Sequence, residues 1–294
     1  MTVRCVGVLV ALSLLGSAKA ASAQDEPLDV QKVRPNLFLL NGGSPNAATT
    51  VVFVRSKDVV VIDTKGPRPE WGRVIAVEVK RLTRLPITTI INTSGSGDHV
   101  AGNVALVNNR MEIIAHERAA TDMRRMTLMF TKPNGGGLPT RTFKDRLTFG
   151  SGADRIELYY LGAGHCHADT FVVIPALRVL LTGDAFGGKF LPALVRPNGG
   201  DGVAYPETLT KALALTRDVD TLITSHGGLA KPKDLAVHRD FMRDFLESAK
   251  QAKKAGRTAA AAAKAWRVPD RYLGYTAKPA WVLGGMEWIY RQLP

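Results

Sequence analysis

Short apolar segments recur along the chain and predict buried β-strands. Residues 35–41 (PNLFLLN) and 48–55 (ATTVVFVR) alternate or run continuously in apolar character, and the β-branched run at 58–64 (DVVVIDT) is typical of a strand buried on both faces. The same criteria predict further strands at 87–92, 112–115, 147–149, 155–160, 170–174, 179–181 and 221–224. The chain is therefore expected to build extensive β-sheet.

Between these strands, apolar residues recur at helical spacing. Trp71, Ile75 and Val79 lie on one face of a helix predicted at 69–85. Further helices are predicted at 104–108, 117–130, 205–215, 232–255, 259–266 and 281–293. Because helices alternate with strands and no long linker divides the chain, we predict a single α/β domain at 24–294. Its last part, about 232–294, is expected to be a helical C-terminal extension.

The first residues (MTVRCVGVLVALSLLGSAKAASAQ) have the composition of a secretory signal peptide. Arg4 precedes an apolar stretch at 5–16, and small-residue cleavage patterns follow at 18–20 and 21–23. The apolar stretch is too short for a membrane span, and the alternative is a buried N-terminal helix. We therefore expect a signal peptide at 1–23 and a periplasmic or secreted protein with no membrane span after its removal.

The sequence carries 39 Lys and Arg against 26 Asp and Glu, a formal net charge of +13. The basic residues are scattered, which favours a generally basic surface over a dedicated anion-binding face. No nucleic-acid partner is expected, and the sequence makes no prediction of oligomeric state. Cys5 lies in the predicted signal peptide, so Cys166 remains alone, forms no internal disulfide and is expected to be buried.

Imidazole and carboxylate groups gather where the predicted strands end. The histidines in such positions are His99, His165, His167 and His226, and the acids are Asp63, Asp98 and Asp184. Loops at strand ends converge on one rim of a sheet, and imidazole with carboxylate is a ligand set that Zn²⁺ takes. His116 and His238 fall in predicted helices or helix entries and are expected to be structural or exposed.

The motifs that contain these residues give the chain a family resemblance. They are IDT at 62–64, DHVAGN at 98–103, GAGHCHAD at 162–169, LLTGDAF at 180–186 and ITSHGG at 223–228. In order and spacing the chain resembles the metallo-β-lactamase-fold hydrolase superfamily over roughly 33–229. The resemblance implies an αββα sandwich, in which two mixed β-sheets are flanked by helices and metals sit at one sheet edge.

The central motif of that family, His-x-His-x-Asp-His, is incomplete here. Its first two histidines fall on Ser94 and Ser96, while Asp98 and His99 match. In the family the two missing histidines and the match at His165 hold a first metal. Asp98, His99 and the match at His226 hold a second, and the match at Asp184 bridges the two. The resemblance therefore implies one Zn²⁺, with Asp98, His99, Asp184, His226 and His165 as candidate ligands, and leaves open that none is bound.

Several neighbouring residues keep two interpretations. Asp63 and Asp169 either hold the far nitrogens of ligating histidines or make ordinary strand-end turns. Cys166 is expected to pack as a small residue, with a thiolate ligand as the alternative. His167 is a weak substitute ligand, because an extended loop would point it away from His165. A nucleophilic Ser96 is disfavoured, since Ser94 stands where a G-x-S-x-G pattern needs Gly.

The Gly-rich loop at 94–97 has one further interpretation, a phosphate-binding site formed by backbone amides. A metal role is preferred because Asp98 and His99 lie in the same loop.

These expectations define a function and an alternative. The leading hypothesis is an exported hydrolase that uses one divalent metal to activate water against an ester, amide, lactone or thioester in a small-molecule substrate. Asp98 would act as proton acceptor, and the glycine-rich segments 132–139 and 187–202 would cover the substrate. The alternative is a catalytically inactive binding or accessory protein of the periplasm. Nucleic-acid processing is a third and weaker possibility, because export argues against it.

Overall fold

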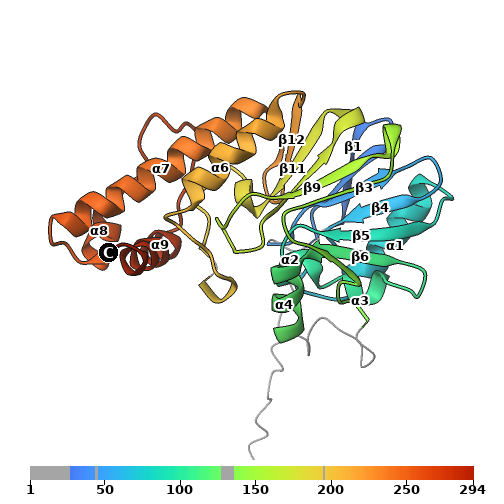
Figure 1. Ribbon diagram of the computed structural model, residues 1–294, viewed down its shortest axis with the longest axis horizontal. Coiled ribbons are helices and arrows are strands. Elements are labelled where there is room, and N and C mark those ends of the chain that lie inside the picture. The colour runs from blue at the N-terminus through green and yellow to red at the C-terminus, as the bar shows by residue number, and fades with distance from the viewer. Residues whose placement is uncertain (1–26, 44–45, 127–135, 195) are drawn as a thin grey trace, which may run out of the picture.

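A computed structural model describes residues 27–43, 46–126, 136–194 and 196–294, and within them the strands form two sheets (Figure 1). The seven-stranded sheet has the order β1-β2-β3-β4-β5-β6-β7, and the six-stranded sheet has the order β13-β12-β11-β10-β9-β8. The strands are β1 (Asp29–Arg34), β2 (Leu37–Asn41), β3 (Thr50–Val54), β4 (Val59–Ile62), β5 (Ile87–Asn92), β6 (Glu112–His116), β7 (Arg141–Phe143), β8 (Arg146–Phe149), β9 (Ile156–Tyr160), β10 (Thr170–Ile174), β11 (Val179–Gly183), β12 (Thr221–Thr224) and β13 (Gly228–Ala230). The helices are α1 (Trp71–Leu82), α2 (Gly97–Val100), α3 (Asn103–Leu106), α4 (Glu117–Arg125), α6 (Tyr205–Leu213), α7 (Pro232–Lys254), α8 (Ala259–Ala265) and α9 (Pro279–Gln292).

Both sheets are mixed, and their parallel parts decide where the strand ends meet. β4 to β7 are parallel neighbours, whereas β1 to β4 pair antiparallel. In the six-stranded sheet β11 and β12 are parallel and the other pairs are antiparallel. Parallel neighbours deliver their carboxyl ends to the same edge of a sheet. The residues that follow β4 and β5, and those that follow β11 and β12, are therefore brought together in pairs.

The central core lies between the two sheets. Phe53 and Ile91 from the seven-stranded sheet belong to the same buried cluster as Val172 and Leu181 from the six-stranded sheet. These strands read as nearly continuous apolar runs because their other faces are buried as well, under helices.

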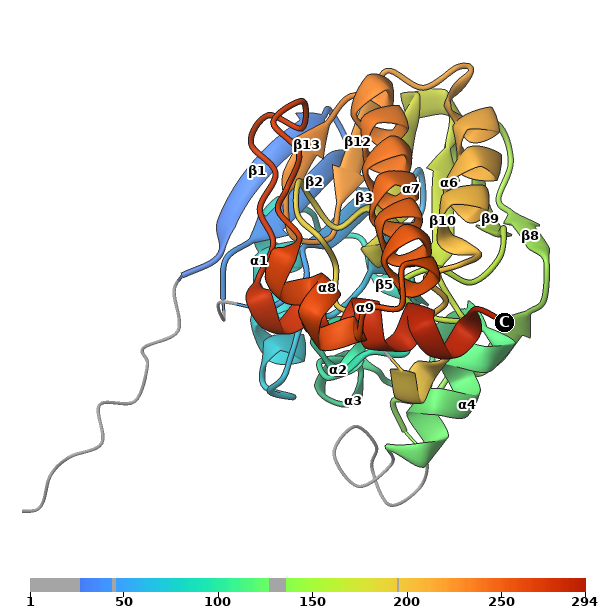
Figure 2. The same ribbon diagram turned by 90° about the vertical axis from the view of Figure 1, so that its left-hand side faces the viewer.

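Helices cover the outer face of each sheet (Figures 1 and 2). Ile75 and Val79 of α1 pack with Val61 on the seven-stranded sheet. Leu209 of α6 and Phe241 of α7 belong to the cluster that covers the six-stranded sheet. The layers are therefore helix, sheet, sheet and helix, which confirms the predicted αββα sandwich.

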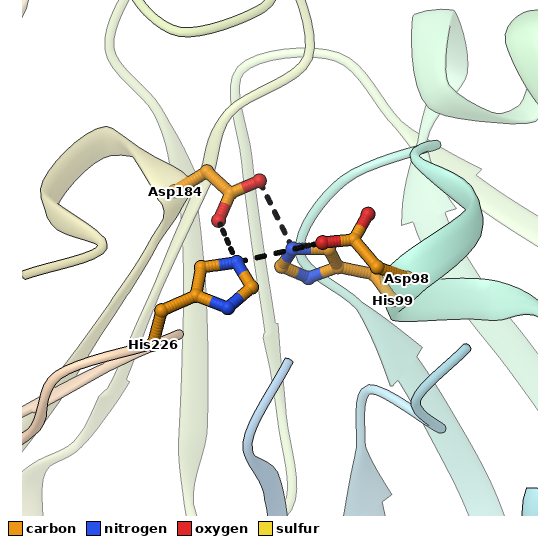
Figure 3. A group of neighbouring side chains, drawn as sticks. All are labelled: Asp98, His99, Asp184 and His226. Atoms are coloured by element: carbon orange, nitrogen blue, oxygen red, sulfur yellow. Dashed lines mark hydrogen bonds and ion pairs between the residues drawn. The ribbon is translucent and has the colours of Figure 1, made fainter. Parts of the chain in front are cut away.

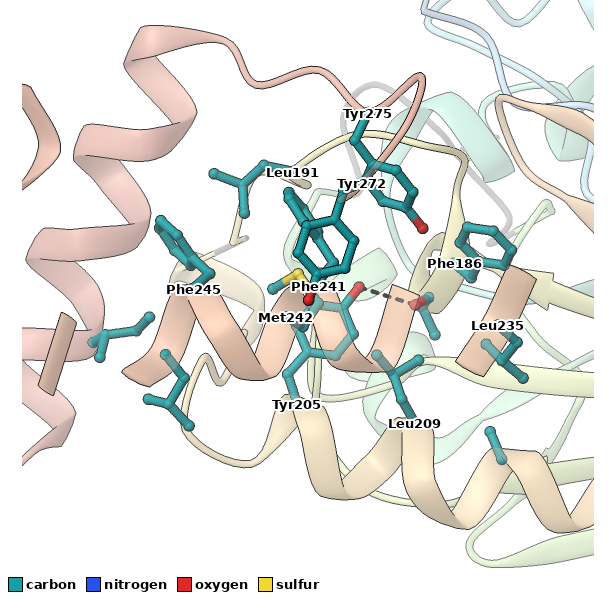
Figure 4. Close-up of a cluster of buried hydrophobic side chains, with 14 of the residues drawn as sticks. Phe186, Leu191, Tyr205, Leu209, Leu235, Phe241, Met242, Phe245, Tyr272 and Tyr275 are labelled. Carbon is teal, nitrogen blue, oxygen red and sulfur yellow. Dashed lines mark hydrogen bonds between the residues drawn. The ribbon is translucent and has the colours of Figure 1, made fainter. Parts of the chain in front are cut away.

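The C-terminal helices pack on the domain rather than extending away from it. Tyr272 and Tyr275, from the segment between α8 and α9, lie against Phe241 of α7 with ring centroids 5.1 and 4.6 Å away (Figure 4). Leu191, from the loop after β11, belongs to the same cluster. The predicted helical extension is present, and it reaches the loop that follows Asp184.

The differences from the predicted elements lie mainly at edges and ends. The unpredicted strands β1, β7 and β13 lie at sheet edges, where one neighbour and partial burial require few apolar residues. The strand predicted at 58–64 ends at Ile62, because Asp63 turns the backbone with a φ of 56°. The helix predicted at 117–130 ends at Arg125, and residues 127–130 lie outside the described residues.

Two predictions concern the chain as a whole, the signal peptide and the single domain. The predicted signal peptide at 1–23 lies outside the described residues. In the part of the chain that the structure describes, no helix has the length and apolar character needed to cross a bilayer. The single domain at 24–294 stays a prediction.

Candidate metal centre

Four donor side chains converge at the edge where the parallel strands end. Asp98 and His99 lie in the short helix α2, in the connection that follows β5. Asp184 directly follows β11, and His226 lies two residues beyond the end of β12. Figure 3 shows the four side chains pointing toward one another from these separate loops. The order of parallel strands thus gathers residues that are up to 128 positions apart, from Asp98 to His226, into one cluster.

The spacing of the donor atoms suits one small cation. His99 Nε2 lies 3.0 Å from Asp184 Oδ2, and His226 Nε2 lies 3.2 Å from Asp184 Oδ1. Asp98 Oδ2 lies 3.4 Å from His226 Nε2 and 3.8 Å from His99 Nε2. Ligands around a tetrahedral zinc ion, with bonds near 2.1 Å, are about 3.4 Å apart. One donor atom from each of the four residues lies within 4.8 Å of the others, so the four surround a space that suits one small cation.

The cluster is closed on one side and open on the other. The His99 side chain is fully buried and Asp184 is 7% exposed, whereas His226 and Asp98 are 24% and 30% exposed. A cation bound among them would have protein on the His99 side and an accessible face beside Asp98 and His226. Catalytic metal sites keep such an open position for water or substrate.

His99 is held in place by a carboxylate behind it. Its Nδ1 lies 2.7 Å from Asp63 Oδ2, and Asp63 in turn accepts hydrogen bonds from the Thr93 amide (2.8 Å) and hydroxyl (2.6 Å). Because a carboxylate accepts, His99 carries its proton on Nδ1 when neutral, and Nε2 faces Asp184. Asp63 therefore selects the tautomer that a metal ligand needs.

Asp184 is fixed by groups that the sequence did not single out. Ser225 donates to Asp184 Oδ1 over 2.6 Å, and the Tyr205 hydroxyl donates to the Asp184 backbone oxygen over 3.1 Å. Ser225 lies inside the motif at 223–228 and Thr93 directly precedes Ser94, so their position in the chain was a usable signal. Tyr205 lies at the start of α6 and carried none.

The charges in the cluster shift the pKa values of its members. Burial opposes a charge on His99, but Asp184, Asp63 and Asp98 raise the pKa of His99 well above its usual range. Burial likewise opposes a charge on His226, yet Asp184 and Asp98 raise the pKa of His226 to about 9. Burial alone would raise the pKa of Asp184, but His99 and His165 hold it well below the usual value. A cation bound here would have to displace protons from imidazoles.

The positions of the two missing histidines carry hydroxyls. Ser94 is fully buried, and its Oγ lies 3.0 Å from Ser96 Oγ and 4.0 Å from Cys166 Sγ. His165 Nδ1 is buried without a hydrogen-bond partner and lies 3.4 Å from Asp184 Oδ2. His165 is therefore the one imidazole on this side among the described residues, and it points its nitrogen toward the four-residue cluster.

The residue within hydrogen-bond distance of the Asp169 carboxylate is Cys166, not a histidine. The Cys166 thiol donates to Asp169 Oδ1 over 3.0 Å, and the Cys166 amide donates to Asp169 Oδ2 over 3.1 Å. His165 Nδ1 lies 3.9 Å from Asp169 Oδ1. Burial and the Asp169 charge raise the pKa of the Cys166 thiol well above its usual range. The geometry is that of a packed, protonated thiol.

The remaining histidines lie away from the cluster. His167 Nε2 lies 2.8 Å from Asp122 Oδ2, and its amide donates to the Asn198 backbone oxygen, so it links the loop at 196–199 to α4. His116 Nε2 lies 2.8 Å from the Lys144 backbone oxygen. His238 is buried and stacks on Phe186, with ring centroids 4.7 Å apart.

A cavity of about 710 Å³ opens over the exposed side of the cluster. It is lined by Asn46, Ser96, Asp98, His165, Asp184, Gly187, Phe190, Pro192, Ala193, His226, Thr276, Lys278 and Trp281. Part of the segment 187–202 lines the cavity, as the sequence led us to expect. Of the other expected cover, 132–139, the positions 132–135 lie outside the described residues.

The fold and the cluster define a class of protein: an αββα sandwich with imidazoles and carboxylates gathered at one sheet edge. The sequence profile of the metallo-beta-lactamase superfamily matches residues 43–226, which is more than half of the 294 residues. The chain belongs to the metallo-beta-lactamase superfamily.

Curated relatives and solved structures agree with this membership. A metallo-beta-lactamase type 2 of Bacteroides fragilis is 24% identical over 162 residues, which cover 55% of this chain and 62% of that enzyme. The match to an enzyme of the same name from Elizabethkingia meningoseptica is 26% identical over 181 residues, covering 60% of this chain and 69% of that enzyme. This chain thus matches less than two thirds of the length of the Bacteroides enzyme.

Two solved structures show how far the fold extends. The DIM-1 metallo-beta-lactamase superimposes with a TM-score of 0.64 at 16% identity, over 75% of this chain and 99% of that one. The stereoselective inverting sec-alkylsulfatase Pisa1 from Pseudomonas sp. superimposes with a TM-score of 0.73 at 16% identity, over 90% of this chain and 50% of that one. At these identities the likeness establishes the fold alone.

Proposed function

We propose that the protein is a hydrolase that holds one zinc ion with Asp98, His99, Asp184 and His226. The observation that carries this proposal is the set of donor distances of 3.0 to 3.8 Å among these residues. The support of His99 by Asp63 adds to it. His165 is a candidate fifth donor, because its Nδ1 lies 3.4 Å from Asp184 Oδ2.

The ion would supply Lewis-acid chemistry, lowering the pKa of water and polarising a carbonyl oxygen of an ester, amide, lactone or thioester. The protein's own residues would do the rest. Asp98 lines the cavity and is partly exposed, so it is placed to accept the proton of an attacking water. Asp63 and Ser225 keep His99 and Asp184 from rotating, which preserves the arrangement during turnover.

The proposal does not choose among an ester, an amide, a lactone and a thioester as the bond that is cleaved. A small molecule fits the cavity of about 710 Å³. The fold likeness to the sec-alkylsulfatase covers 90% of the chain and so has to include part of residues 232–294. An alkyl sulfate ester therefore joins the substrates to be tried. We also propose export to the periplasm or beyond, on the composition of residues 1–23.

The test combines metal content with turnover. Protein purified without chelator is analysed for zinc and assayed on nitrocefin, a 4-nitrophenyl ester, a lactone, a thioester and a secondary alkyl sulfate. About one equivalent of zinc and turnover of at least one substrate are expected, and Asp184→Asn should lose both. Asp122→Asn is the matched control, since Asp122 is a buried carboxylate bound to His167 away from the cluster. Turnover that survives in metal-free protein would refute the proposal.

The serines favour a second candidate. With hydroxyls at Ser94 and Ser96, the cluster lacks the imidazoles that a second ion would need. A binding or accessory protein that takes up zinc but turns over none of the substrates would fit that loss. The same assay separates the two candidates, because only the hydrolase couples zinc content to product formation.

A further inference from the structure

The C-terminal extension forms one wall of the cavity over the donor cluster. Thr276, Lys278 and Trp281 line it together with Phe190 from the loop after β11. The two segments are joined by backbone hydrogen bonds, from Leu191 N to Thr276 O (2.9 Å) and from Thr276 N to Lys189 O (3.1 Å). The wall is therefore a built part of the cavity and not a loose contact of a terminal segment.

Helix α9 anchors the part of this wall that carries the charge. Lys278 is the residue directly before α9, and Val282, Met286 and Ile289 of that helix are buried. The position of the Lys278 backbone is thus fixed on both sides, by the packed helix and by the Thr276 hydrogen bonds. Its exposed side chain contacts an aromatic ring, with Nζ 4.3 Å from the ring centroid of Trp281.

Lys278 is a cation with no carboxylate partner among the described residues. Among the described residues that line the cavity, it is the one Lys or Arg. Within the same described part of the chain, no carboxylate lies within 4.0 Å of its Nζ. An ammonium group on an aromatic face keeps hydrogen-bond donors free for a ligand.

Apolar surface surrounds this cation. The rings of Phe190 and Trp281 have centroids 5.9 Å apart, and Pro192 and Ala193 continue the same lining. Asp98, Asp184 and His226 of the donor cluster line the cavity as well. The cavity thus offers one molecule a cluster of donors, an apolar wall and a single side-chain ammonium.

We propose that Lys278 and Trp281 form a substrate subsite for an anionic group, so that the substrate is an amphiphile with an apolar body and a carboxylate or sulfate away from its scissile bond. The proposal rests on the proposed function for the identity of the reacting end. The Lys278 ammonium pairs with the anion, Trp281 and Phe190 contact the apolar body, and the scissile group lies over Asp98 and His226.

Kinetics on a matched pair of esters tests the subsite. The neutral ester is 4-nitrophenyl butyrate, and the anionic one is mono-4-nitrophenyl glutarate, which adds a distal carboxylate. Lys278→Met is expected to lower kcat/KM for the anionic ester about tenfold, mainly through KM, and to leave the neutral ester unchanged. Lys278→Arg should keep the preference. Lys264→Met, which removes the same charge from an exposed position of α8 outside this cavity, should change neither ester.

A binding measurement keeps the two proposals separable. Titration calorimetry compares 4-phenylbutyrate with 4-phenylbutanol on Asp184→Asn protein, where no contact between carboxylate and metal contributes. The carboxylate should bind about tenfold more tightly, and adding Lys278→Met should abolish the difference. If these binding results hold and none of the five substrate types is turned over, the hydrolase proposal fails and the subsite stands. Equal binding of the two ligands, or equal loss on both esters, would overturn the subsite.

Discussion

Asp63 Oδ2 lies 2.7 Å from His99 Nδ1, and this contact orients the most deeply buried donor of the cluster. Asp63 has a backbone φ of 56°, a conformation that Asp and Asn tolerate better than most residues. The carboxylate and the strand-end turn are therefore two properties of one residue. The two interpretations that the sequence left open for Asp63 describe the same position.

Replacing Asp63 by Asn should weaken zinc binding without unfolding the protein. Asn fits the same backbone conformation but presents an amide, which no longer enforces a proton on His99 Nδ1. Loss of such a supporting carboxylate typically lowers metal affinity by about 10- to 100-fold. The measurement is competition for zinc against a chromophoric chelator. Asp122→Asn, which disrupts the similar pair with His167, should leave the affinity unchanged. Equal losses in both variants would contradict the assigned role.

Restoring histidine at Ser94 and Ser96 together should create a second metal site. Both serines lie on the side of the cluster where His165 offers a buried nitrogen without a hydrogen-bond partner. With three imidazoles, that side would match the ligand number of a zinc site. We expect zinc content to rise from about one equivalent to about two. Metal analysis of the double variant, with thermal unfolding as the check on folding, decides the matter. An unchanged stoichiometry in a folded variant would count against it.

His238 should make the protein sensitive to acid. Burial lowers the pKa of His238 to about 3 from the ordinary 6.5, and neither ring nitrogen has a hydrogen-bond partner among the described residues. Below pH 6.5, therefore, the His238 imidazole binds a proton in the unfolded chain but stays neutral in the folded chain. This favours unfolding by about 1.4 kcal/mol for each pH unit down toward 3. Above pH 6.5 both states are neutral and the effect vanishes.

Replacing His238 by Phe removes that proton while keeping the stack on Phe186. Urea unfolding at pH 7.5 and pH 5.0 should show an advantage of the variant that grows by about 2 kcal/mol at the lower pH. The difference between the two pH values serves as the internal control. An advantage of the same size at both would mean that His238 does not titrate as its burial implies.

Two substitutions of Cys166 separate packing from metal ligation. A serine hydroxyl can still donate to Asp169 Oδ1, whereas alanine leaves that buried oxygen without its donor. Cys166→Ala should therefore lose about 1 to 3 kcal/mol of stability, and Cys166→Ser should lose less. Zinc content should be unchanged in both, since the thiol is protonated and bonded to Asp169. Loss of zinc in both variants would identify the thiolate as a ligand instead.

Most strands and helices of the fold were predicted from the sequence alone. Apolar runs such as 58–64 and the helical spacing of Trp71, Ile75 and Val79 are local patterns, and local patterns survive in the folded chain as β4 and α1. The edge strands β1, β7 and β13 were missed because an edge strand needs little apolar character, whereas the edge strand β8 was predicted at 147–149. β1, with four exposed residues out of six, is an example.

The sequence by itself also determined which side chains could meet, because Asp98, His99, Asp184 and His226 each follow a strand, and parallel strands bring such positions to one edge. Tertiary structure decided the rest. Asp169 accepts a hydrogen bond from Cys166, and His167 pairs with Asp122. The C-terminal extension places Lys278 and Trp281 in the lining of the cavity. The first two contacts join the loop after β9 to itself and to α4, and the last depends on how α7 to α9 pack against the six-stranded sheet. Periodicity within one segment records which face is buried, but not which distant segment will cover it.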